Sequence, residues 1–154
     1  MVSRYIKKPK STHLMAAKRI LHYIKGTISY GLLYTRCDGF QLIGYTDSDW
    51  ARDVDERRST TVYVFFLDNT AFSWSSKKQV IVTLSTYEAE YVAASSGVCN
   101  TIWLRNLLND LQLNQEQPTK IYIDNKSTIT LAKNPVFNEM SKHIDNRYHF
   151  IRET

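Results

Sequence analysis

The segment Phe40-Gln-Leu-Ile-Gly-Tyr-Thr-Asp47 predicts a β-strand whose last residue is a carboxylate. Two other acids stand at comparable places in the chain. Glu90 lies in the first turns of a predicted long helix, and Asp124 directly follows a short, β-branched, apolar run at 120–123. Strand ends and a helix start can meet at one point of an α/β sheet. Because a charge buried among apolar strands is costly unless it is offset, the three acids predict a divalent cation.

Composition limits the classes of protein to consider. The chain has 154 residues, 43% of them hydrophobic and 12% aromatic, which is enough to bury one substantial core. A formal net charge of +5 favours a polyanionic partner. The two cysteines, Cys37 and Cys99, predict buried, reduced thiols and hence an intracellular protein. No long apolar stretch is present, so we expect no signal peptide and no membrane partner.

Hydrophobic periodicity predicts alternating strands and helices. The predicted elements are a basic amphipathic helix at 11–25, a hairpin of strands at 30–35 and 40–46, strands at 59–67 and 70–74, a helix at 85–111, a strand at 120–123, and helices at 127–132 and 141–153. Ser85 and Glu88 form the pattern of a capping box at the start of the long helix. The order of elements predicts antiparallel strands followed by at least one parallel crossover.

Position within each element selects among the neighbouring acids. Alternation places Asp47 on the same strand face as Tyr45 and Ile43, whereas Asp49 falls beyond the predicted strand, at the start of a charged loop over 49–58. On the long helix, Glu88 already has a capping role and Glu90 has none. The structural alternative for Glu90 is an exposed acid favoured by the helix dipole.

Asp124 has its own structural alternative, because Asp124 with Asn125 fits an Asx turn or an N-cap for the following helix. Taken alone, Glu90 and Asp124 are each explained by their local structure. Taken together, the three acids supply the few carboxylate oxygens that Mg²⁺ prefers, and two such ions can support phosphodiester hydrolysis.

An ordered series of motifs over nearly the whole chain resembles the ribonuclease H domain of copia-type LTR retrotransposon polyproteins. The motifs are Gly44-Tyr-Thr-Asp-Ser-Asp-Trp-Ala51, Ser73-Trp-Ser-Ser-Lys-Lys-Gln79, Leu84-Ser-Thr-Tyr-Glu-Ala-Glu-Tyr-Val-Ala-Ala94, Asp124-Asn-Lys-Ser127 and Lys142-His-Ile-Asp-Asn-Arg-Tyr-His-Phe150. The preceding segment, with Ala16-Ala-Lys-Arg-Ile20 and Tyr23-Ile-Lys-Gly-Thr27, resembles the end of the reverse transcriptase region. The resemblance therefore divides the chain into two parts, residues 1–35 and residues 36–154.

The resemblance implies an α/β fold of the ribonuclease H type, a mixed sheet with flanking helices. It implies metal-dependent hydrolysis of the RNA strand of RNA–DNA hybrids during reverse transcription. The catalytic and metal-binding residues would be Asp47, Glu90 and Asp124, with two Mg²⁺ or Mn²⁺ ions. Partners would be the RNA–DNA hybrid and the reverse transcriptase domain of the same polyprotein, in the cytoplasm or within virus-like particles.

The chain reaches Thr154 without the family's fifth strand and without the last helix, which carries a fourth carboxylate. We therefore expect a ribonuclease H-like domain that lacks its last strand and C-terminal helix. This leaves a second functional hypothesis, a catalytically inactive remnant that at most binds nucleic acid.

Five polar residues near the acids are candidate substrate contacts. Ser48, Asn125 and Ser127 flank the predicted metal site and can meet the 2′-hydroxyl groups of an RNA strand. Lys77 and Lys78 are candidate phosphate contacts. The structural alternatives are turn or helix-cap roles for the first three and a solvated basic face for the two lysines.

Overall fold

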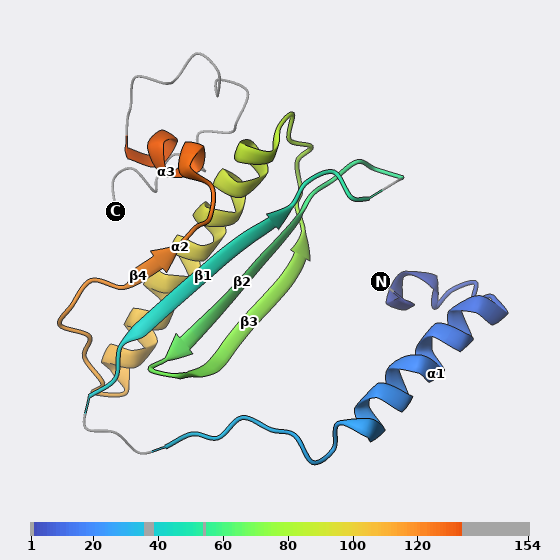
Figure 1. Cartoon of the computed structure of the whole chain (residues 1–154), viewed down its shortest axis with the longest axis horizontal. Helices are drawn as coiled ribbons and strands as arrows, with labels where there is room; N and C mark the ends of the chain where they lie inside the picture. The colour runs from blue at the N-terminus through green and yellow to red at the C-terminus, as the bar shows by residue number, and fades with distance from the viewer. Residues whose placement is uncertain (1, 36–38, 54, 134–154) are drawn as a thin grey trace. The chain divides into compact units, whose positions relative to one another are not determined.

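A long helix packs against one face of a four-stranded mixed sheet in the computed structural model, which describes residues 2–35, 39–53 and 55–133 (Figure 1). The strands are β1 (Leu42–Asp49), β2 (Thr60–Leu67), β3 (Thr70–Lys78) and β4 (Lys120–Tyr122), in the sheet order β3-β2-β1-β4. Helix α2 (Thr86–Asp110) precedes β4 and helix α3 (Lys126–Lys133) follows it. The predicted α/β class is confirmed, and the arrangement is compatible with a ribonuclease H-like fold.

The sheet combines two kinds of strand pairing. Strands β1, β2 and β3 are antiparallel, and β4 is parallel to β1, as the order of elements predicted. Strand β4 has only three residues, and Tyr122 stacks on Tyr45 of β1 with ring centroids 4.9 Å apart. This aromatic pair strengthens a short parallel contact by about 0.5–1.5 kcal/mol beyond simple burial.

Strand β1 extends to Asp49, so the prediction that Asp49 lies beyond this strand is wrong. Two further predicted strands differ from the structure. Residues 30–35 form no strand, so the predicted hairpin with 40–46 is wrong. Both edges of β1 are occupied, by β2 and by β4, and no edge remains for a third strand. The second difference is that β3 continues to Lys78, beyond the predicted end at residue 74.

The chain divides into two compact units, Met1–Thr35 and Arg36–Thr154. The first contains a short 3₁₀ helix, η1 (Val2–Tyr5), and helix α1 (Ser11–Gly26), which matches the predicted basic helix. Tyr5 stacks on His13 with ring centroids 4.1 Å apart, yet no residue of α1 is buried. The predicted helix at 141–153 and Cys37 lie outside the described residues. Cys99 is exposed, so its predicted burial is wrong.

The core of the second unit lies between α2 and the sheet. Its main cluster joins Leu42 of β1 and Phe65 of β2 to Leu104 and Leu108 of α2. A second cluster pairs Tyr91 of α2 with Leu131 of α3. Together the clusters hold the start of α2 against α3 and its second half against the sheet.

Polar contacts fix the segments that enter α2 and β4. The Ser85 hydroxyl accepts from the Glu88 backbone N–H, which confirms Ser85 as the N-cap. The Glu88 carboxylate accepts from the Leu84 N–H, one residue earlier than the capping box predicted. Farther along α2, the Arg105 guanidinium donates to the carbonyl oxygens of Gln115 and Gln117, which anchors the connection to β4.

Helix α2 lies close to β1 at Gly97. A Cβ atom at this position would overlap Cγ2 of Thr46, the residue before Asp47. The absence of a side chain at Gly97 therefore sets the spacing between α2 and β1, the two elements that carry Glu90 and Asp47.

We expect Gly97→Ala to destabilise the fold. Overpacking costs about 1–3 kcal/mol, and replacing a helical glycine by alanine returns about 1 kcal/mol, so the net loss in the free energy of unfolding reaches up to about 2 kcal/mol. Thr46→Ser removes the methyl group that the new Cβ meets, so the double variant should recover stability. Denaturant unfolding of the four proteins measures the coupling, and strictly additive effects would contradict the proposed contact.

Candidate metal centre

Three carboxylates from different elements converge at one end of the sheet. Asp47 lies near the end of β1, Glu90 in the first turns of α2, and Asp124 just after β4. One oxygen from each lies within 4.8 Å of the others. Because β1 and β4 are parallel, both strands finish at the same end of the sheet. Helix α2, which forms the crossover to β4, begins at that end. Asp47 and Asp124 are exposed, whereas Glu90 is only 6% exposed.

The Glu90 carboxylate is held by one backbone donor. Its Oε1 accepts a hydrogen bond from the Ser48 N–H at 3.2 Å, and the same N–H lies 2.6 Å from Oδ1 of Asp47. Its Oε2 is buried and has no hydrogen-bond partner. The Ser48 hydroxyl oxygen is also buried without a partner. The centre thus contains buried oxygen atoms whose hydrogen-bonding capacity is unused.

Burial and like charge act together on Glu90. Desolvation, followed by the charges of Asp124 and Asp47, raises the pKa of Glu90 from 4.5 to about 7, and the Ser48 N–H partly opposes this rise. A carboxylate in this setting is stabilised either by a proton or by a cation. Three oxygen ligands with an unused buried lone pair suit Mg²⁺ or Mn²⁺, so the residues fit the predicted ions.

Neighbouring acids are engaged elsewhere. Asp49 pairs with Arg52 at 3.3 Å, and Glu88 accepts the Leu84 N–H. The choice of Asp47 over Asp49 and of Glu90 over Glu88 therefore agrees with the geometry. The assignment of the three converging acids as catalytic residues stays a prediction.

Of the predicted substrate contacts, those after β4 are part of a helix start. The Asn125 Oδ1 accepts from the backbone N–H groups of Ser127, at 2.9 Å, and Thr128, at 3.2 Å. This is the N-cap alternative for Asn125. The Ser127 side chain is exposed in the first turn of α3. The Thr128 hydroxyl donates to the Tyr87 carbonyl oxygen, which joins this helix start to α2.

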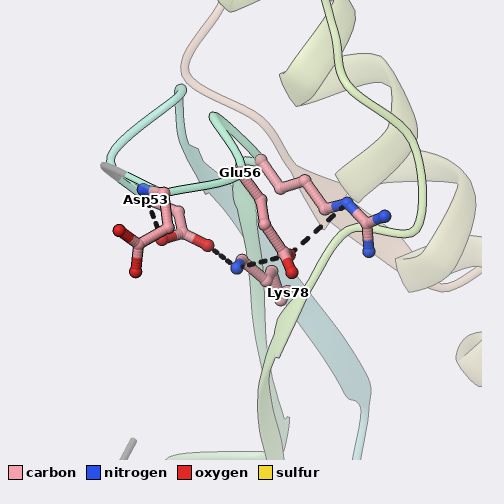
Figure 2. A network of polar contacts seen from close by, with 5 residues as sticks. Asp53, Glu56 and Lys78 are labelled. Carbon is pink, nitrogen blue, oxygen red and sulfur yellow. Dashed lines mark hydrogen bonds and ion pairs between the residues drawn. The ribbon is translucent and has the colours of Figure 1, made fainter.

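The two lysines of β3 have different surroundings. Figure 2 shows the Lys78 ammonium group between the carboxylates of Asp53 and Glu56. The Glu56 carboxylate also pairs with Arg58, at 3.7 Å. Lys77 is exposed and has no ion-pair partner in the described part of the chain. Lys78 therefore ties the loop after β1 to β3, and Lys77 retains an uncompensated charge.

Sequence reasoning missed the polar residues that brace the centre. The Ser59 and Thr83 hydroxyl oxygens lie 3.1 Å apart and are buried, joining the loop after β1 to the segment before α2. The Gln79 Nε2 donates to Oγ1 of Thr61 and to the carbonyl oxygen of Ala89, next to Glu90. No periodicity or motif marks these pairings, because they join segments that are distant in the sequence.

Several known proteins similar to this chain are transposon polyproteins. The chain is 44% identical over 153 residues to the retrovirus-related Pol polyprotein from transposon TNT 1-94 of Nicotiana tabacum, a match covering 99% of the chain and 11% of that protein. It is 40% identical over 151 residues to the retrovirus-related Pol polyprotein from transposon RE1 of Arabidopsis thaliana, covering 98% of the chain and 10% of that protein. The chain is homologous to a segment of the Pol polyproteins of copia-type retrotransposons.

The chain spans about a tenth of the length of these polyproteins.

The chain is also 45% identical over 104 residues to the secreted RxLR effector protein 161 of Plasmopara viticola, covering 68% of the chain and 73% of that protein. Neither a protein-family profile nor a solved structure matches the chain. Within the described residues, none of the helices has both the length and the apolar character needed to cross a bilayer.

The raised pKa of Glu90 predicts a specific pH dependence of stability in metal-free protein. Because the folded state binds the Glu90 proton more tightly than the unfolded state, this contribution is fully present below about pH 4.5 and is lost as the pH rises to about 7. Glu90→Gln removes the titration. We expect the variant to match the parent near the lower limit and to melt a few degrees higher above the upper limit. Thermal unfolding in a chelator measures the difference.

Added Mn²⁺ gives the matching control. It should raise the melting temperature of the parent above pH 7 and have a much smaller effect on the Glu90→Gln protein. A difference in melting temperature between the two proteins that did not vary with pH would contradict the buried, charge-repelled state of Glu90.

Proposed function

We propose that the second unit is a metal-dependent endonuclease that hydrolyses the RNA strand of RNA–DNA hybrids during retrotransposon reverse transcription. The observation that carries the proposal is the convergence of Asp47, Glu90 and Asp124 within 4.8 Å, with one buried Glu90 oxygen unpartnered. Homology to the copia-type Pol polyproteins supports it, because such elements replicate through reverse transcription.

The three carboxylates would hold two Mg²⁺ or Mn²⁺ ions. When bound, such ions activate water and stabilise the leaving oxygen of a phosphodiester. The chain's own contribution is orientation: the Ser48 N–H holds Oε1 of Glu90, and the Ser85 cap fixes the helix start that carries Glu90. Asp47 and Asp124 are exposed and so remain open to ions and substrate.

The substrate class follows from charge and family together. A formal net charge of +5 favours a polyanion. An RNA–DNA hybrid carries 2′-hydroxyl groups on one strand only, and the exposed hydroxyl of Ser127 is the candidate to meet them near the metal centre. The Ser48 hydroxyl, the other candidate from the sequence, is buried and does not face a substrate. The reverse transcriptase domain of the same polyprotein would supply the hybrid, in the cytoplasm or within virus-like particles.

Cleavage of a hybrid labelled on its RNA strand tests the proposal. With Mg²⁺ or Mn²⁺, we expect cleavage by the 154-residue protein and a loss of about 100-fold or more in Asp47→Asn, Glu90→Gln and Asp124→Asn, because each change removes one charged ligand. Asp49→Asn is the matched control, since it removes a nearby carboxylate outside the cluster and should retain activity within about threefold.

Each contrary outcome has a distinct meaning. Cleavage by Asp124→Asn at the parental rate would show that the cluster is not the catalytic site. A well-folded parent that binds the hybrid but does not cleave it would overturn the enzymatic proposal and favour the non-catalytic remnant. Single-stranded RNA and duplex DNA, tested alongside the hybrid, report the substrate class.

A further inference from the structure

An open cavity lies between β3 and α2, apart from the three carboxylates. Its volume is about 310 Å³. The residues that line it are Thr61, Tyr63, Ser75, Lys77, Lys78, Gln79, Val80, Val92, Ser96, Cys99 and Asn100. The set contains two lysines and no acid. The cavity therefore carries positive charge and hydroxyl groups, which suit an anionic oxygen ligand.

Strand alternation separates the roles of the two lysines. Lys77 pairs in register with Thr61, a buried residue on the α2 side of the sheet, so Lys77 belongs to that side. Lys78 belongs to the opposite side, and its ammonium group is held by Asp53 and Glu56 (Figure 2). Lys77 is thus the cation of the cavity whose charge has no ion-pair partner in the described residues.

A row of paired residues across the sheet connects the cavity to Ser48, whose backbone N–H donates to Glu90 in the metal centre. Ser48 of β1 is opposite Thr61 of β2, and Thr61 is opposite Lys77 of β3. Adjacent strands are about 4.8 Å apart, which places the Lys77 backbone about 10 Å from Ser48, the residue that binds Glu90. This separation is well within one turn of a nucleic-acid duplex, about 34–36 Å.

The cavity is also braced against the helix that carries Glu90. The buried Gln79 amide joins Thr61 to the carbonyl oxygen of Ala89, and the Asn100 amide donates to the Ser96 carbonyl oxygen at 2.8 Å. A ligand held in the cavity would therefore keep a fixed position relative to the metal centre.

We propose that this cavity binds a backbone phosphate of the nucleic-acid strand, with Lys77 as the charged contact. The inference rests on the proposed function and deepens it, because it assigns a second anchoring point that would align the hybrid over the three carboxylates. A phosphate suits a cationic site without acids, and backbone contacts of this kind fix register without reading sequence.

Equilibrium binding to a fluorescent RNA–DNA hybrid tests the site without requiring cleavage. The measurement uses the full chain carrying Asp124→Asn, in a chelator, over a series of salt concentrations. Added to this background, Lys77→Met should weaken binding about three- to tenfold and reduce the salt dependence by about one phosphate contact. Lys77 is exposed, so the variant should fold normally, and thermal unfolding checks this.

Lys120→Met is the matched control, because Lys120 is an exposed lysine on β4, at the other edge of the sheet. It removes the same charge and should change affinity less than about twofold. Asn100→Asp places a carboxylate in the cavity and should weaken binding as Lys77→Met does. Inorganic phosphate, compared with chloride at equal ionic strength, should compete with the hybrid for the Asp124→Asn protein. It should not compete for the same protein carrying Lys77→Met.

The outcomes separate this inference from the proposed function. Equal losses of affinity in Lys77→Met and Lys120→Met would show that Lys77 contributes only through the general charge of the protein, and would overturn the cavity as a site. Undetectable binding of the hybrid would also overturn the cavity as a site. Cleavage by the parent combined with unchanged binding by Lys77→Met would overturn only the cavity, whereas Lys77-dependent binding without cleavage would overturn only the endonuclease.

Discussion

The parallel pairing of β1 with β4 is the constraint on which the rest of the site depends. A parallel pair needs a crossover that returns the chain to the starting end of the sheet, and α2 is that crossover. The end of β1, the end of β4 and the start of α2 consequently lie at the same end of the sheet. Asp47, Asp124 and Glu90 occupy these three places, so the topology alone brings them together. Because β4 has only three residues, its position relies on side-chain contacts, among them the Tyr45–Tyr122 stack and the connection anchored by Arg105.

Convergence of three acids has an electrostatic cost that the fold does not remove. The Ser48 N–H is a single neutral donor, and it only partly opposes the desolvation and repulsion that raise the pKa of Glu90 to about 7. The fold nevertheless enforces the approach, because Gly97 allows α2 to pack closely on β1 and buried hydroxyls join the flanking loops. Geometry that is maintained at an electrostatic cost is typical of functional sites, since a protein without such a need has simpler ways to place its acids at the surface.

Sequence patterns predicted the features that depend on local order. Strand alternation selected Asp47, the cap at Ser85 located the start of α2, and the alternation of strands and helices predicted a parallel crossover. The patterns failed where tertiary structure, and not local sequence, determines the conformation or the burial of a residue. Residues 30–35 are rich in strand-forming side chains, yet both edges of β1 are occupied and these residues form no strand. Cys99 lies in an apolar run, but helix geometry leaves it exposed. Because the predicted strand ended at residue 74, strand alternation did not predict that Lys77 and Lys78 lie on opposite sides of the sheet.

In the proposed endonuclease, the charge pattern of the chain would link metal binding to substrate binding. The protein as a whole carries a formal net charge of +5, which attracts a polyanion, while the three clustered carboxylates repel any phosphate that approaches them. Two unit charges 4 Å apart interact by about 4 kcal/mol at the effective dielectric of a protein surface, so this local repulsion outweighs a diffuse attraction at close range. A phosphate can therefore settle beside Asp47 and Asp124 only when cations neutralise them. Lys77, an uncompensated lysine whose backbone lies about 10 Å from Ser48 across the sheet, has the opposite effect, because it favours a neighbouring phosphate whether or not cations are bound. Under the proposed function, this arrangement would separate binding of the strand from its cleavage. General and local positive charge would retain the nucleic acid, and cation occupancy of the carboxylates would decide whether a phosphate enters the centre.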